Sequence, residues 1–290
     1  MKTQFDIPAL PVVYANDANY KVVAGENGAP NRCFIFFSSN GLYFPNTEAE
    51  FYRTVILANR YEWENLSPSK SKFRKAIYVR DVRKTWYVDG ISTDLNCVDN
   101  LFRKLKEETD GFAEVVCVGN SAGGYAATLF GILLGAERIF NISGFFEITS
   151  QINDPTNLAL QYAQSEHKKF KWFDLSTLLL ENKSAIYFLF PENCELDKSQ
   201  ARIVENVQSV RTFAFNEDSH GVCAHNFVYP FLFVKSKAEL DSLFIRNRKK
   251  SWSRFDFSLE TIGLGKTLLF FLVYLKRRSL KLITKWLNRQ

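Results

Sequence analysis

The sequence predicts an α/β fold with a mostly parallel β-sheet flanked by helices, and three observations support this class. Short apolar runs with the length of buried strands recur along the chain up to residue 215. Segments with helical periodicity separate them, which is the pattern of strands joined by helical crossovers. An apolar content of 46% with 23% charged residues is typical of a globular chain, and 290 residues can enclose one large core.

The predicted elements begin with an edge hairpin over residues 11–25, which has Asn16 and Asp17 in its turn. The strands expected after it are 33–37, 75–80, 115–118, 137–142, 184–190 and 210–215, and the separating helices lie near 47–59, 93–109, 122–135 and 199–207. Residues 146–183 have weak strand character and several aromatic side chains. We expect them to form a small helical lid over the functional site, with an ordinary helical connection as the alternative.

A Gly-x-Ser-x-Gly motif, Gly119 to Gly123, joins the apolar run at 115–118 to the next helix. A serine at a sharp strand-to-helix turn needs glycine neighbours, because a Cβ would clash where the chain reverses. Such a turn lifts the Ser121 hydroxyl above the sheet, and the N–H of Ala122 at the helix N-terminus then faces a developing oxyanion. We therefore predict that Ser121 is a nucleophile; the alternative is a glycine-rich turn with an incidental serine.

A serine in this setting requires a general base, and the chain has three histidines. His220 lies in a polar loop directly after the predicted strand 210–215, which is where the order serine, acid, histidine places the base. His225 begins the next helical stretch, and His167 lies in a charged surface segment. We predict that His220 is the base.

The acid is expected after the strand at 184–190, where three carboxylates remain open: Glu192, Glu195 and Asp197. Asp197 is favoured because it directly precedes a helical pattern, where N–H groups hold a short side chain while it accepts from an imidazole. Capping of that helix is its alternative role. In this scheme Ser121 attacks an ester or thioester carbonyl, His220 moves the proton, and the acid orients the imidazole.

A second oxyanion donor is expected from the loop after strand 33–37. This loop reads Ser38-Ser39-Asn40-Gly41, and the glycine permits the tight approach of main chain that a donor loop needs. We predict the main-chain N–H near Asn40 as that donor, and a plain β-turn is the alternative.

The elbow and the serine–acid–histidine order resemble the α/β-hydrolase superfamily, over roughly residues 10–245. A finer resemblance is to bacterial surface-polysaccharide proteins, including capsule O-acetyltransferases. It is carried by Ile77–Asp81, Trp86-Tyr87 with Gly90, Gly119–Gly124 and the Asp197 loop. The chain departs from the superfamily at Cys194, where many relatives have the acid.

The resemblance implies acyl transfer from acetyl-CoA, with no bound cofactor, to a sugar hydroxyl of a polysaccharide at the cytoplasmic membrane face. The reverse deacetylation is the related possibility. A general carboxylesterase or lipase is a second reading, and a catalytically inactive binding module of a glycan-assembly complex is a third.

Residues 246–290 differ from the hydrolase-like domain predicted over 1–245. They carry twelve Lys/Arg against Asp256 and Glu260, a net charge of +10, so residues 1–245 carry about −4 of the total of +6. The apolar run 267–275 and the Lys/Arg clusters that follow it predict an amphipathic helix on an anionic membrane surface. A helix docked on the protein or on a partner is the rival, whereas nucleic acid is disfavoured because its recognition relies on phosphate contacts.

The five cysteines are scattered and form no C-x-x-C pair, so neither a structural zinc site nor a disulfide framework is predicted. The first residues lack the apolar core of a signal peptide. We therefore expect a cytoplasmic protein, held peripherally on the inner membrane face.

Overall fold

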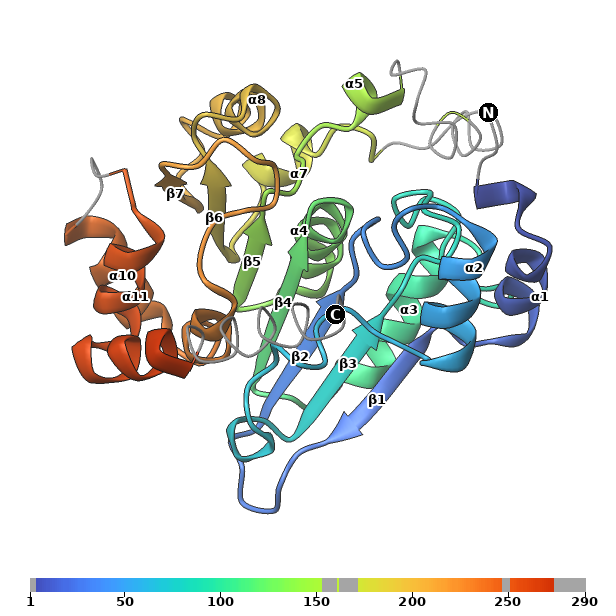
Figure 1. The fold of residues 1–290 in the computed structure, drawn as a ribbon, viewed down its shortest axis with the longest axis horizontal. Coiled ribbons are helices and arrows are strands. Elements are labelled where there is room, and N and C mark those ends of the chain that lie inside the picture. The colour runs from blue at the N-terminus through green and yellow to red at the C-terminus, as the bar shows by residue number, and fades with distance from the viewer. Residues whose placement is uncertain (1–3, 153–160, 162–171, 247–250, 274–290) are drawn as a thin grey trace, which may run out of the picture.

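A seven-stranded sheet with the strand order β1-β3-β2-β4-β5-β6-β7 forms the centre of the computed structural model, which describes residues 4–152, 161, 172–246 and 251–273 (Figure 1). The strands are β1 (Tyr20–Ala24), β2 (Arg32–Phe37), β3 (Lys75–Val79), β4 (Glu114–Asn120), β5 (Arg138–Ile142), β6 (Ala185–Pro191) and β7 (Val210–Phe215). Every neighbouring pair is parallel except β1 with β3, which is antiparallel. The predicted α/β fold with a mostly parallel sheet flanked by helices is therefore confirmed.

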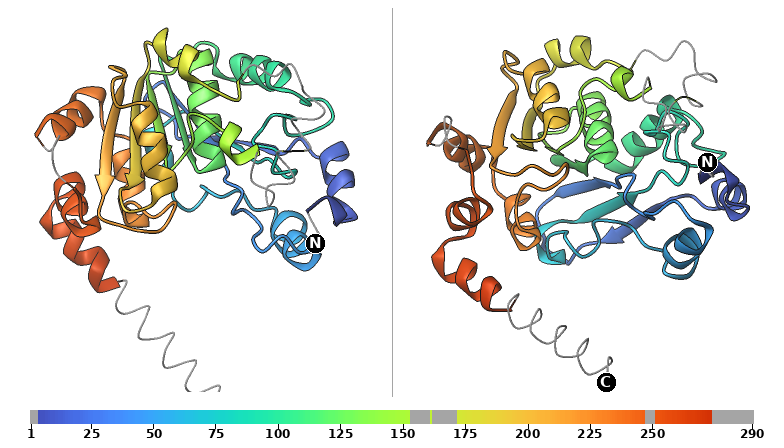
Figure 2. Two further views of the ribbon diagram at one scale, coloured as in Figure 1. Left: turned by 90° about the horizontal axis from the view of Figure 1, so that it is seen from above. Right: turned by 45° about the horizontal axis from the view of Figure 1, so that its top comes forward.

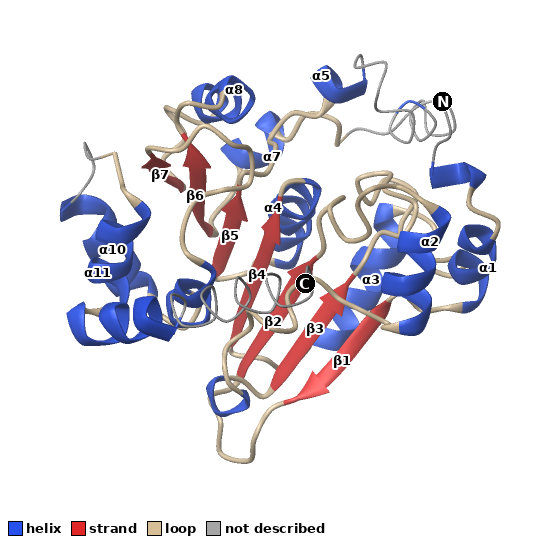
Figure 3. Ribbon diagram, in the orientation of Figure 1, coloured by secondary structure: helices blue, strands red, loops and turns tan. Residues whose placement is uncertain are grey.

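Helices cover both faces of this sheet (Figure 3). In the first half they are η1 (Gln4–Asp6), α1 (Ala9–Asn16), α2 (Glu48–Phe51) with its π-helical continuation η2 (Tyr52–Leu57), η3 (Lys70–Lys72), α3 (Val98–Thr109) and α4 (Ala122–Leu134). In the second half they are α5 (Thr149–Ile152), α7 (Ser176–Leu180), α8 (Glu195–Ile203), η4 (Asn226–Val228), α9 (Tyr229–Leu232), α10 (Lys237–Arg246) and α11 (Arg254–Ile262). The predicted helix at 93–109 thus begins later, at Val98.

Two apolar clusters form because alternate residues of a strand point to opposite faces. In β2, Cys33, Ile35 and Phe37 pack with α3 and α4, whereas Phe34 and Phe36 pack with α9, α10 and α11. All five side chains are at most 1% exposed, which explains why the strand reads as a continuous apolar run.

The predicted edge hairpin over residues 11–25 is wrong in its first half. Residues 9–16 form helix α1, and only Tyr20–Ala24 is a strand, which pairs with β3. Leu10 and Val13 lie three residues apart on one helical face and are buried in a cluster with Tyr43 and Phe51. Pro11 is tolerated because it lies in the first turn, where its missing N–H has no helical partner.

Parts of the predicted lid and tail lie outside the described residues, and so does His167. Within 146–183 the structure describes α5 and α7. Within 246–290, α11 is followed by helical residues 264–273, and Figure 2 shows both in red at one side of the sheet. Trp252 and Phe257 are at most 1% exposed and belong to the same apolar cluster as Phe34 and Phe36. No helix in the described ranges is long and apolar enough to cross a membrane.

Candidate active site

Ser121 lies at the turn between β4 and α4, in a backbone conformation that L-residues rarely adopt (φ 53°, ψ −121°). Its N–H donates to the carbonyl of Ile142 at 2.9 Å, which fixes the turn to β5. A Cβ on Gly119 would lie 1.9 Å from the Gly123 carbonyl oxygen, and a Cβ on Gly123 would lie 2.3 Å from the Phe37 carbonyl oxygen. The motif therefore needs glycine at both flanking positions.

His220 lies in the loop after β7, and its ring faces Ser121. Its Nε2 lies 2.9 Å from Ser121 Oγ, although 99 residues separate the two in sequence. The Phe145 ring packs edge-on against the imidazole, with 5.9 Å between ring centroids. The strand order explains the meeting, because β4 and β7 both end at the same edge of the sheet.

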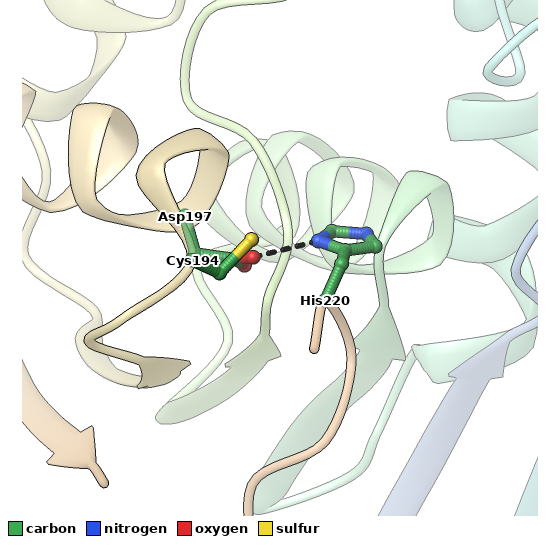
Figure 4. A group of neighbouring side chains, drawn as sticks. All are labelled: Cys194, Asp197 and His220. Atoms are coloured by element: carbon green, nitrogen blue, oxygen red, sulfur yellow. Dashed lines mark hydrogen bonds and ion pairs between the residues drawn. The ribbon is translucent and has the colours of Figure 1, made fainter. Parts of the chain in front are cut away.

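Asp197 completes a hydrogen-bonded chain, since its Oδ2 lies 2.8 Å from His220 Nδ1 (Figure 4). The prediction placed Asp197 just before a helix over 199–207. In the structure it lies within the first turn of α8, because that helix begins earlier, at Glu195. Its side chain is 1% exposed, against 32% for His220. The structure thus brings Ser121, His220 and Asp197 together.

The two alternative acids lie elsewhere. Glu192 accepts a hydrogen bond from Ser251 Oγ. Glu195 is 74% exposed and pairs with Lys198 at 3.3 Å. Neither is hydrogen-bonded to the imidazole of His220.

The hydrogen-bonded chain defines which proton transfer is feasible. A carboxylate only accepts hydrogen bonds, so His220 Nδ1 must carry the proton that faces Asp197. Nε2 of the neutral ring is then free to accept from the Ser121 hydroxyl. This arrangement suits removal of the serine proton during attack on a carbonyl.

The predicted oxyanion donors belong to the helix that follows Ser121 and to the loop after β2. Ala122 is the first residue of α4, so its N–H has no partner within the helix. Asn40 lies half-buried in a turn of the loop after β2, and neither N–H has a hydrogen-bond partner among the described residues. A Cβ on Gly123 would lie only 2.3 Å from the Phe37 carbonyl oxygen, so the start of this loop lies close to the turn that carries Ser121.

Glu62 holds the loop after β2, a role that the sequence analysis did not predict. Its carboxylate accepts from both the main-chain N–H and the hydroxyl of Ser39, the hydroxyl at 2.9 Å. Ser39 Oγ in turn accepts from Gly41 N–H at 3.0 Å. Burial raises the pKa of Glu62, which the hydrogen bonds from Ser39 oppose. These bonds engage Ser39 and Gly41, on either side of Asn40.

A second support comes from the residues that carried the finer resemblance. Asp81 accepts from Tyr87 N–H at 2.9 Å, and the Tyr87 hydroxyl donates to the Ser38 carbonyl at 2.7 Å. Burial raises the pKa of Asp81 to about 6. Trp86 packs at 5.0 Å from Phe145, the ring that contacts the imidazole. This segment therefore braces the loop directly and the His220 ring through Phe145.

The remaining predicted residues have other surroundings. His225 precedes η4 and stacks on Phe227 at 5.2 Å, away from the hydrogen-bonded chain. All five cysteines are free. Cys223 lies 3.5 Å from Ser143 Oγ, whereas Cys194 lies beside Asp197 and His220.

Comparisons with known proteins find similarity in solved structures alone: no protein-family model and no curated protein matches the chain. The capsule O-acetyltransferase of Neisseria meningitidis serogroup A is 11% identical, with a TM-score of 0.49 over 79% of this chain and 92% of that one. Acetyl xylan esterase 1 from Thermoanaerobacterium sp. is 13% identical, with a TM-score of 0.44 over 80% and 79%. MenH from S. aureus is 12% identical, with a TM-score of 0.42 over 79% and 97%. Likenesses this distant carry no argument about activity.

Proposed function

We propose that the chain is a serine-dependent acyl-transfer enzyme that works through an acyl-serine. The observation that supports it is the hydrogen-bonded chain from Asp197 through His220 to Ser121, with contacts of 2.8 and 2.9 Å. An incidental serine needs neither a strained backbone nor an imidazole at its hydroxyl.

In this proposal the Ser121 hydroxyl attacks an ester or thioester carbonyl while His220 Nε2 takes its proton. The N–H groups of Ala122 and Asn40 stabilise the oxyanion, and the imidazolium then protonates the leaving group. Asp197 keeps the ring in its working tautomer and stabilises its positive charge. Water or a second hydroxyl finally attacks the acyl-serine.

We further propose acetyl-CoA as the acyl donor and a sugar hydroxyl of a bacterial surface polysaccharide as the acceptor. The support is the sequence resemblance, in particular Tyr87 and Trp86, which brace the loop and the base in the structure. General carboxylesterase or lipase activity is the alternative within the same chemistry.

Labelling with a fluorophosphonate probe tests the nucleophile. The wild-type protein should be labelled, and Ser121→Ala should lose the label. Ser219→Ala is the matched control, because this exposed serine neighbours His220 and its hydroxyl bonds only to Asp218 among the described residues. Labelling that persists in Ser121→Ala contradicts the proposal, and an unlabelled wild type favours an inactive binding module.

Transfer is separated from hydrolysis by incubating the protein with acetyl-CoA and candidate polysaccharides. Acetylated sugar should accumulate faster than free acetate. Acetate released at the same rate with and without polysaccharide contradicts the transferase and favours the esterase.

We also propose that the enzyme is cytoplasmic and that its C-terminal segment holds it on anionic lipid. Helical residues 264–273 pack Phe270 and Phe271 against Phe227, at 5.0 and 5.8 Å between ring centroids. The side chains left 40% to 65% exposed are Leu264, Leu268, Leu269, Leu272 and Val273. An exposed apolar face next to a strongly basic segment suits a helix in a membrane interface.

Substitution tests this better than deletion of 246–290, which would remove the core residues Trp252 and Phe257. Changing Leu264, Leu268 and Leu272 together to serine should weaken co-sedimentation with phosphatidylglycerol vesicles at least tenfold. Leu57→Ser is the control, because Leu57 is 69% exposed on a different helix. Unchanged binding of the triple variant contradicts the membrane proposal.

A further inference from the structure

A thiol lies next to the carboxylate and the imidazole of the active site. Cys194, Asp197 and His220 each offer one ligand atom, and the three atoms lie within 4.8 Å of one another (Figure 4). One sulfur, one oxygen and one nitrogen donor thus lie close together.

Local structure explains the juxtaposition. Cys194 is the residue that precedes α8, and Asp197 follows three positions later in its first turn, so both side chains lie on one side of the helix end. His220 reaches them from the loop after β7, with Nδ1 already 2.8 Å from Asp197 Oδ2. No local sequence motif such as C-x-x-C predicts this group, because its members come from two separate segments.

We propose that this group binds a Zn²⁺ ion through Cys194 Sγ, an Asp197 carboxylate oxygen and His220 Nδ1. Thiolate, imidazole and carboxylate are the ligands that zinc prefers in proteins. Bond lengths of about 2.0 to 2.3 Å in a tetrahedron put ligand atoms about 3.3 to 3.6 Å apart. The observed separations, up to 4.8 Å, therefore need shifts of roughly 1 Å.

The fourth position of the ion faces solvent. The His220 side chain is 32% exposed and Cys194 is half-buried, so a water molecule completes the tetrahedron and the ion has a path to the site. Mg²⁺ and Ca²⁺ do not suit this group, because they prefer oxygen ligands.

Zinc binding here blocks the base, a consequence that rests on the proposed function. The thiol releases its proton to solvent, and the proton on His220 Nδ1 moves to Nε2 as the metal takes its place. Nε2 then carries hydrogen and no longer accepts from the Ser121 hydroxyl. The enzyme is thus reversibly inhibited by Zn²⁺.

Calorimetric titration of the untagged full-length protein with ZnCl₂ tests binding directly. Wild type should bind one equivalent, and Cys194→Ser should bind at least tenfold more weakly. Cys97→Ser is the matched control, since Cys97 is also half-buried and precedes a helix, and it should bind like wild type. Equal affinity of wild type and Cys194→Ser overturns the site.

Cobalt substitution gives a reading that does not depend on any variant. Co²⁺ bound to the wild-type protein should show the near-ultraviolet charge-transfer band of a cobalt–thiolate bond. Co²⁺ bound without that band overturns the assignment of Cys194.

Hydrolysis of p-nitrophenyl acetate then tests inhibition. Zn²⁺ should inhibit wild type, EDTA should restore it, and Cys194→Ser should keep basal activity while resisting Zn²⁺ at least tenfold. Activity that is insensitive to bound Zn²⁺ overturns the inhibition. A protein that binds Zn²⁺ but hydrolyses no ester and takes no fluorophosphonate label instead refutes the proposed function and leaves the metal site standing.

Discussion

Replacing Asp197 by asparagine tests the charge of the acid while keeping its size. The carboxylate is 1% exposed and bonds to His220 Nδ1 at 2.8 Å, so it is well placed to stabilise the imidazolium formed during attack. Two unit charges about 4 Å apart interact by about 4 kcal/mol at an effective dielectric constant of about 20. Loss of that energy corresponds to roughly 10³-fold in rate. Asp197→Asn should therefore lower kcat/KM about 10³-fold. The loss is larger if the asparagine amide donates a hydrogen bond to His220 Nδ1.

The assay is hydrolysis of p-nitrophenyl acetate, with the rate of fluorophosphonate labelling as an independent measure. Glu195→Gln is the matched control, because Glu195 lies in the same helical turn and its ion pair with Lys198 is solvent-exposed. We expect its kcat/KM within about twofold of wild type. More than a tenth of wild-type activity in Asp197→Asn, with its Tm unchanged, refutes the assignment. An equal loss in Glu195→Gln does so as well.

Three further predictions concern two residues that shape the site and one histidine outside it. Glu62→Gln should lower kcat about tenfold with little change in KM, because one of the two Ser39 donors loses its acceptor; an unchanged kcat contradicts this. Gly123→Ala should cost about 3 kcal/mol in urea unfolding, since its Cβ would lie 2.3 Å from the Phe37 carbonyl oxygen; a variant as stable as wild type shows that the loop yields freely. Burial lowers the pKa of His225 below 6.5, so the folded state binds fewer protons and stability falls as pH drops through that value. His225→Phe should flatten this dependence between pH 7 and 5, and parallel curves for the two proteins count against it.

The strand-to-helix turn could be predicted because its determinants are adjacent in sequence. An apolar strand, two glycines and a helix of small residues specify the position of Ser121 locally. Chain order and the expected strand ends narrowed the choice of histidine and of carboxylate. That left three candidate acids, and only the fold shows which one faces the ring.

The wrong and the missing predictions concern segments whose structure is determined by contacts distant in sequence. Residues 9–16 contain β-branched Val12 and Val13, which favour a strand, yet packing of Leu10 and Val13 against Phe51 makes the segment helical. Glu62 lies in a loop without any motif, and its role depends on Ser39, 23 residues earlier. Neither contact is encoded in a local pattern.

The backbone at Ser121 has a thermodynamic consequence for the whole chain. With φ at 53° and ψ at −121°, the residue occupies a region that costs a side-chain-bearing residue about 1–3 kcal/mol. Glycine adopts this conformation freely, so Ser121→Gly should unfold at a higher temperature than wild type while losing the acyl-transfer activity. Folding alone would thus favour glycine at this position, and the side chain that carries the hydroxyl lowers the stability of the protein.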